Sequence, residues 1–235
     1  MTERAEDLQF EALRAYTFLS SFRQDWGGAL IVGCGLGPGG AALSIAGNMA
    51  GAGCLAIEEQ ADVCRAAVRS GACDFVVNTV DEALRILKNE IRKRQPVSVA
   101  LSMNEAAALN ELVERGVQPE LFAAFGDSAP IAEDAALRFG ALGAVIAKFD
   151  QGSGAGVDVD AKLEEFTAPH GLSPAALLFP DGEQLRITDA ELFQIIPPDD
   201  RRRRWLAAAA RFFHRERPHR RVMYLTSAER EKLGV

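Results

Sequence analysis

A glycine-rich turn at residues 35–40 has the residue types and spacing that bind phosphate groups. Gly35, Gly37 and Gly40 fit the pattern G-x-G-x-x-G, with Pro38 and Gly39 between them. In this pattern the first glycine permits a tight turn, the second lets backbone approach a pyrophosphate, and the third lets a helix pack close to a strand. Free N–H groups at the start of the next helix would face the phosphates, because the helix dipole favours negative charge there. We therefore expect Gly35, Gly37, Gly39 and Gly40 to contact a nucleotide cofactor.

The segments around this turn follow the order strand, helix, strand. Residues 29–34 form an apolar run before the turn, residues 41–50 are small and suit a close-packed helix, and residues 54–57 form a second apolar run that ends at Glu58. A carboxylate at the end of the second strand is the usual partner of a ribose hydroxyl. The sequence therefore predicts a site that joins the turn to Glu58, although a tight strand–helix turn that binds nothing has the same pattern.

Alternating helical and apolar segments continue after Glu58. The expected strands are 75–77, 97–101, 121–124 and 142–147, and the expected helices are 3–24, 60–70, 79–94, 104–116 and 131–140. Strands that alternate with helices of about ten residues or more indicate a parallel sheet with helical crossovers. We expect an α/β, Rossmann-like three-layer fold with a mostly parallel sheet, and we assign residues 1–150 to this domain.

The last third of the chain has a different pattern, which predicts a smaller α+β portion. Residues 151–156 resemble a linker or mobile loop, and residues 151–235 form a C-terminal extension that is either separate or part of the same domain. We expect a hairpin at residues 176–187, with its turn at Pro180–Glu183. A basic helix should then start at Asp199 or Asp200, and a last strand is expected at residues 222–225.

The charge of the chain is distributed unevenly. The formal net charge is −7, whereas residues 201–221 contain nine arginines and one acid, a net of +8, and residues 222–235 balance to zero. Residues 1–200 therefore carry −7 − 8 = −15. The asymmetry suggests that the basic segment docks on an acidic partner, such as a second copy of the chain in a homo-oligomer. Alternatively, it is a solvated basic helix whose aromatic residues pack on the core. Nucleic acid is disfavoured, since the chain is acidic overall and lacks an RNA-motif aromatic pattern.

The sequence also constrains location and metal chemistry. No apolar run approaches the roughly 20 residues of a membrane span, and the polar N-terminus lacks a signal-peptide pattern, so we expect a cytoplasmic protein. The four cysteines form no C-x-x-C pair and the three histidines all lie late in the chain, which predicts no metal site. The cysteines should be reduced core thiols, and Cys34, beside the glycine turn, is the one candidate for a catalytic thiol.

Residues 30–125 resemble the central NAD-binding domain of urocanase, the urocanate hydratase of histidine breakdown. The resemblance is carried by Gly35–Ala41, Met49–Ala52, Cys54–Glu58, Val97–Asn104 and Glu111–Glu120. It implies NAD as the cofactor, with the turn around Gly37 and Gly39 facing the pyrophosphate, Glu58 at a ribose and Asn104 lining the cofactor. The position of Asn104 agrees with the rule that ligands bind beyond the carboxyl ends of parallel strands.

The chain departs from that family in the residues that complete the chemistry. The family has a Gln-Thr-Ser-Ala-His segment near the nicotinamide, where this chain reads Phe125-Gly126-Asp127-Ser128-Ala129. The catalytic Cys and Tyr that urocanases take from flanking regions have no counterpart here. Asp127 and Glu105, which both follow expected strand ends, are the nearest candidates for a general acid or base, and they also suit the interpretation of exposed loop carboxylates.

Three functions are consistent with these observations. The first is a urocanase-like protein that binds NAD or a related nucleotide, in its enzymatic form a lyase or hydratase acting on a small acidic substrate. The second is a SAM-dependent methyltransferase, because residues 32–37 resemble a methyltransferase glycine motif, although Ile31 and Val32 replace the acid that usually precedes it. The third is a non-catalytic interaction or regulatory protein on the same scaffold.

Overall fold

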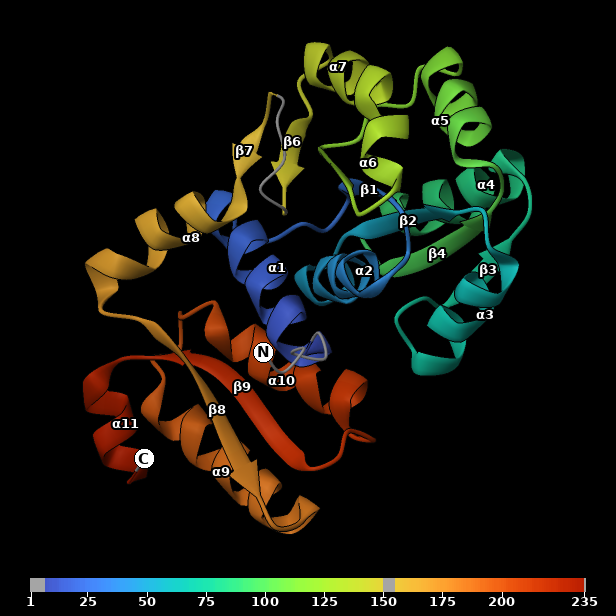
Figure 1. Cartoon of the computed structure of the whole chain (residues 1–235). Coiled ribbons are helices and arrows are strands. Elements are labelled where there is room, and N and C mark those ends of the chain that lie inside the picture. The colour runs from blue at the N-terminus through green and yellow to red at the C-terminus, as the bar shows by residue number, and fades with distance from the viewer. Residues whose placement is uncertain (1–6, 150–154, 235) are drawn as a thin grey trace.

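A parallel seven-stranded sheet forms the centre of the molecule (Figure 1). The computed structural model describes residues 7–149 and 155–234. The strand order is β3-β4-β2-β1-β5-β6-β7, and all six neighbouring pairs are parallel. The strands are β1 (Leu30–Cys34), β2 (Gly53–Glu58), β3 (Phe75–Val77), β4 (Val97–Ser102), β5 (Leu121–Ala124), β6 (Val145–Lys148) and β7 (Val157–Asp158). The α/β class expected from the sequence is confirmed.

Helices cover both faces of this sheet and complete three layers. One face is covered by α1 (Leu8–Phe22), α2 (Pro38–Ala50), α3 (Ala61–Ser70), α8 (Val159–Thr167) and α10 (Arg202–Phe213). The other is covered by α4 (Val80–Arg92), α5 (Glu105–Glu114), α6 (Ser128–Ile131) and α7 (Glu133–Ala141). Successive strand residues point to opposite faces. Ile31 and Val32 therefore belong to two different apolar cores, which explains why the strands are apolar throughout.

Helix α2 lies unusually close to the sheet because its contact residues are small. A Cβ atom added at Gly40 would lie 2.0 Å from the carbonyl oxygen of Gly35, and one added at Gly47 would lie 2.3 Å from Sγ of Cys54. Glycine is required at both positions to permit this approach. The expected role of the third glycine of the pattern, which is close helix–strand packing, is thus met by Gly40.

The C-terminal third packs against α1 and shares its apolar core. It contains an antiparallel ribbon of β8 (Ser173–Phe179) and β9 (His219–Leu225), the short turn η1 (Ala168–His170), and the helices α9 (Gly182–Ile195) and α11 (Ser227–Leu233). Trp205 of α10 is fully buried, and its Nε1 donates to the carbonyl of Val222 at 2.9 Å. From α1, the Tyr16 hydroxyl donates to the carbonyl of Arg201, and Oε1 of Gln9 accepts from N–H of Val222. These bonds tie the ribbon to the first helix of the chain.

The hairpin predicted at residues 176–187 is wrong. Strand β8 pairs with β9, about 40 residues later in the chain, and residues 182–195 form helix α9. The carboxylate of Asp181 accepts hydrogen bonds from N–H of Glu183 and Gln184, both at 2.9 Å, so Asp181 caps a helix instead of closing a hairpin turn. The last expected strand begins earlier than predicted, at His219.

Smaller boundary predictions also need correction. The helix expected at 131–140 is divided into α6 and α7, and the strand expected at 142–147 begins only at Val145, because a turn with Gly143 at φ +96° precedes it. Helix α1 ends at Phe22, before the predicted end. Most of the loop predicted at 151–156 lies outside the described residues, as do the first residues of the helix expected at 3–24.

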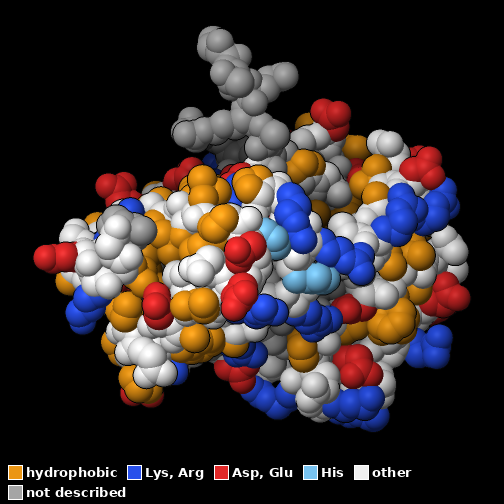
Figure 2. Space-filling model, turned by 90° about the horizontal axis from the view of Figure 1, so that it is seen from below, with side chains coloured by type: hydrophobic (Ala, Val, Ile, Leu, Met, Phe, Trp, Pro, Cys, Tyr) orange, Lys and Arg blue, Asp and Glu red, His pale blue; other side chains and the backbone are white. Residues whose placement is uncertain are grey.

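The arginines of residues 201–221 are mostly engaged within the chain. Five of them form ion pairs with carboxylates of the described residues: Arg202, Arg204, Arg211, Arg220 and Arg221. On the face formed by the C-terminal elements, basic side chains are interspersed with acidic and apolar ones (Figure 2). Much of the positive charge of residues 201–221 is therefore neutralised by carboxylates of the same chain.

Candidate functional site

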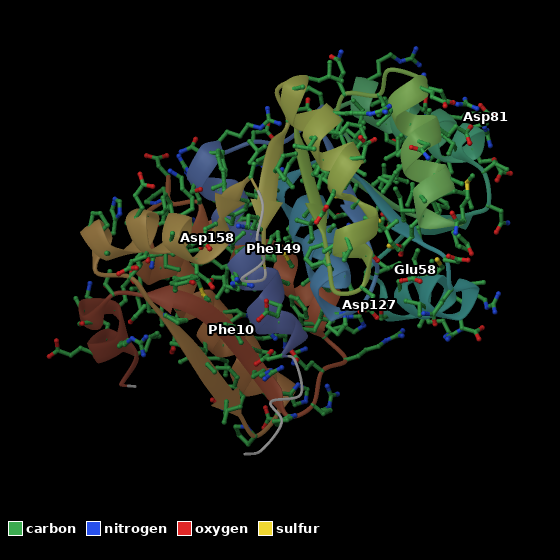
Figure 3. All side chains as sticks on the ribbon, turned by 45° about the horizontal axis from the view of Figure 1, so that its top comes forward. Phe10, Glu58, Asp81, Asp127, Phe149 and Asp158 are labelled. Atoms are coloured by element: carbon green, nitrogen blue, oxygen red, sulfur yellow. The ribbon has the colours of Figure 1, made fainter. Side chains whose placement is uncertain are left out.

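A cleft of about 690 Å³ opens at the carboxyl ends of the parallel strands, beside the turn between β1 and α2. From β1 the chain passes through α2 to β2 on one side, whereas β5 lies on the other side of β1, so the cleft sits where the strand order reverses. Ligands of open α/β sheets bind at this position. Figure 3 shows Glu58 and Asp127 near this edge, with Phe149 toward α1. The lining residues used below are Glu11, Arg14, Gly37, Gly39, Glu58, Glu59, Glu105, Phe125, Asp127, Ser128 and Phe149.

The glycine turn presents one open side to this cleft. Gly35 has φ +86°, a left-handed conformation that favours glycine, and its N–H donates to the carbonyl of Ile57 at 2.9 Å. A Cβ atom added at Gly37 would meet nothing within 4 Å, whereas one added at Gly39 would lie 2.7 Å from the ring of Phe125. The turn is therefore open at Gly37, the N-cap of α2, and closed by an aromatic ring at Gly39.

Glu58 is held at the end of β2 by two backbone N–H groups. Its Oε2 accepts from Leu36 at 3.1 Å and its Oε1 accepts from Gln60 at 2.9 Å, and the residue is 8% exposed. An ionised carboxylate has about four acceptor positions, so two remain for a ligand hydroxyl. The bond to Leu36 also fixes the glycine turn relative to β2. The structure thus brings Gly35, Gly37, Gly39 and Glu58 together along the cleft, as the sequence predicted.

The other two predicted site residues, Gly40 and Asn104, are not part of the cleft lining. Gly40 is buried behind the turn, where it allows α2 to approach Gly35. Asn104 caps α5, because its Oδ1 accepts from N–H of Ala107 at 3.1 Å. Its Nδ2 donates to Oε2 of Glu59 at 3.0 Å, and Glu59 does line the cleft. Asn104 therefore reaches the site through Glu59.

A buried carboxylate and a serine hydroxyl form the floor of the cleft. The Ser128 hydroxyl donates to Oε1 of Glu105 at 2.8 Å, and both residues are 7% exposed. Asp127, the other candidate acid or base, is exposed at the rim. The sequence did not single out Ser128; the available signal was its position after the end of β5. Cys34 lies beside this pair, and burial raises the pKa of its thiol well above the ordinary value. A buried thiol with a raised pKa is a poor nucleophile, which argues against a catalytic Cys34.

Helix α1 contributes a cation that sequence reasoning missed. The guanidinium of Arg14 donates to the carbonyl of Phe149 at 2.7 Å and to Oδ1 of Asp160 at 2.8 Å, and it pairs with Glu11 at 3.2 Å. Among the described lining residues Arg14 is the one cation, against carboxylates at Glu11, Glu58, Glu59, Glu105 and Asp127. No local sequence pattern marks Arg14 as a site residue.

Residues 7–149 and 155–234 contain no cluster of three or more His, Cys, Asp or Glu side chains arranged to hold a metal ion. Over the same residues, no helix combines the length and apolar character needed to cross a bilayer.

The strand order, the glycine turn and the cleft at the point where the strand order reverses define a Rossmann-like α/β domain. Residues 11–126 match the family model described as the urocanase Rossmann-like domain. Residues 11–126 thus form a urocanase Rossmann-like domain, and the resemblance seen in residues 30–125 is confirmed and extended to α1. The match ends at residue 126, so Asp127, Ser128 and the C-terminal elements lie outside it.

Proposed function

We propose that the cleft binds NAD or a closely related nucleotide. The observation that carries this proposal is the open turn at Gly37, placed at the N-terminus of α2 and at the point where the strand order reverses. The first N–H groups of a helix have no partner within it, so that of Gly39, which lines the cleft, is available to a pyrophosphate. Glu58 would accept from a ribose hydroxyl, and Asn104 would act at the rim through Glu59. The family match supports NAD over other nucleotides.

The decisive variant is Gly37→Val. A side chain at this position would enter open space and meet no atom of the protein within 4 Å of its Cβ, so it should fill the ligand's place without displacing neighbours. We expect the Kd for NAD to rise at least tenfold, a loss of about 1.4 kcal/mol of binding free energy. Isothermal titration of both proteins measures this. Ala207→Val, on the exposed face of α10, is the control for adding a valine and should leave the Kd unchanged.

We further propose that the enzymatic form is a lyase or hydratase acting on a small acidic substrate. Glu105, with the Ser128 hydroxyl bonded to it, supplies a carboxylate on the cleft floor that can exchange a proton with a ligand. Arg14 is the lining cation that could pair with a substrate carboxylate, provided that Asp160 or Glu11 releases it. Incubation with NAD and urocanate, followed by the loss of urocanate absorbance, tests this form. Turnover should fall at least a hundredfold in Glu105→Gln.

The alternatives give different results in the same assays. Binding of SAM with no affinity for NAD would favour methyl transfer, for which Glu58 would still hold a ribose. Binding of neither nucleotide would favour a non-catalytic interaction protein on this scaffold.

A further inference from the structure

The C-terminal ribbon has one protected edge and one free edge. Strand β9 is covered on its outer side by α1 and α10, whereas β8 has β9 as its single strand neighbour among residues 7–149 and 155–234 (Figure 1). Side chains of β8 alternate: Ala175 and Leu177 are 8% and 6% exposed, and Leu178 is 68% exposed. Residues 173–179 read Ser-Pro-Ala-Ala-Leu-Leu-Phe and carry no charge. An apolar, uncharged edge strand is a template for pairing with another chain.

The hydrogen bonds of β9 show which groups of β8 face outward. Val222 donates its N–H to Gln9 and accepts at its carbonyl from Trp205, so its backbone points away from β8. Ala176 lies directly opposite Val222 in the antiparallel register. Opposed residues of such a pair point their backbone groups both inward or both outward, so the N–H and C=O of Ala176 face the free edge. Those of Leu178, two residues further on, do the same.

The other end of this edge is partly closed. Pro174 has no N–H, and its carbonyl accepts from the guanidinium of Arg230 at 2.9 Å. Arg230 also bonds the carbonyl and hydroxyl of Ser173. A proline and a basic side chain are common protections of edge strands. They leave the outward groups of Ala176 and Leu178 as the open part of the edge.

We infer that β8 pairs antiparallel with β8 of a second copy of this chain, about a two-fold axis through Ala176. The two Ala176 residues would then exchange both backbone hydrogen bonds, and N–H of each Leu178 would share the carbonyl of the opposite Pro174 with Arg230, because a carbonyl oxygen has two lone pairs. Each exposed leucine would pack against the opposite proline, since residues 174, 176 and 178 share one face of the strand.

Charge complementarity favours a second copy as the occupant. Arg230 lies at the Ser173 end of the edge, and Asp181 follows the Phe179 end. Antiparallel pairing places the basic end of one strand beside the acidic end of the other, and no like charges oppose each other along residues 173–179. The edge at residues 173–179 lies outside the basic segment at residues 201–221 that the charge distribution had suggested as a docking surface. Five arginines of that segment already pair with carboxylates of the same chain.

The test measures the mass of the full-length protein by light scattering after size exclusion, across concentrations. A chain of 25.3 kDa should give a dimer, and Leu178→Lys should raise the dimer dissociation constant at least tenfold. Leu137→Lys is the matched control, because Leu137 of α7 is 67% exposed and lies on the Rossmann-like domain. It should leave the dimer intact. A monomer at every concentration, or a dimer equally affected by both variants or by neither, would overturn the inference.

A covalent test is independent of how well the lysine variant folds. Opposed residues of a hydrogen-bonded antiparallel pair have Cα atoms about 5.5 Å apart, within the range of a disulfide. The four native cysteines are buried, so Ala176→Cys adds an accessible thiol. Mild oxidation should give a disulfide-linked dimer in this variant, and a Leu137→Cys control should not. Absence of the linked dimer from Ala176→Cys would exclude the proposed register.

Discussion

The packing of α2 on β1 makes a specific prediction for Gly40→Ala. The added Cβ would lie 2.0 Å from the carbonyl oxygen of Gly35, a backbone atom that cannot rotate away. Ordinary carbon–oxygen contacts begin at about 3.3 Å, so the helix or the turn must move by roughly 1.3 Å. Overpacking of this kind costs about 1–3 kcal/mol, and alanine returns at most about 1 kcal/mol of helix propensity. We expect a net loss of about 2 kcal/mol.

Thermal unfolding of Gly40→Ala and Gly37→Ala, side by side, checks this estimate. For a chain of this size a loss of about 2 kcal/mol lowers Tm by roughly 4–8 °C. Gly37 is the matched control, since a Cβ there meets nothing within 4 Å, and alanine at an N-cap costs at most about 1 kcal/mol. An unchanged Tm for Gly40→Ala, or an equal fall in both variants, would refute the packing argument.

Two further predictions concern ion pairs of the C-terminal part. Asp189→Asn should lower the unfolding free energy by about 3–5 kcal/mol in urea titrations, because it leaves the charge of Arg221, 1% exposed, without its carboxylate. The double variant Asp189→Leu with Arg221→Met removes both charges and should recover most of this loss. Failure of the double variant to recover stability would contradict a charge effect. Burial alone would raise the pKa of Glu229, but Arg202 and the Thr226 N–H together hold it below its ordinary value. The stabilisation that the ionised Glu229 contributes is complete above the pKa of this carboxyl in the unfolded chain. It is lost as the pH falls through the pKa of the same carboxyl in the folded protein. The stability gap between the parent protein and Glu229→Gln should therefore narrow below about pH 4.5, and a gap constant with pH would contradict this.

The strand and helix pattern of the first 126 residues could be predicted because the local sequence preference of each segment agrees with the strand or helix that it forms. Gly37, Gly39 and Glu58 were predicted to lie together because the glycine spacing and the acid at the strand end specify one local unit. The C-terminal hairpin failed for a physical reason: Pro180, Asp181 and Gly182 suit a turn and a helix N-terminus equally well. The true partner of β8 is about 40 residues away, and no local pattern specifies it.

The places of Glu105, Ser128 and Arg14 in the cleft could not be predicted from the sequence for a similar reason. Glu105 and Asp127 both follow strand ends and look equivalent in sequence, yet one is buried and the other exposed. The difference arises from Ser128, the first residue of α6, whose hydroxyl donates to Glu105. Arg14 enters the cleft from a helix that precedes the whole sheet. Long-range packing decides these roles, and one sequence contains no direct signal of it.

Nucleotide binding by the cleft is tested by mass spectrometry of the small molecules released when the purified full-length protein is denatured in acid. A nucleotide-binding cleft built on Gly37 and Glu58 predicts NAD, at close to one per chain, or a rise in Tm when NAD is added to protein that releases none. Protein that releases no nucleotide and shows no rise in Tm with NAD would contradict the claim.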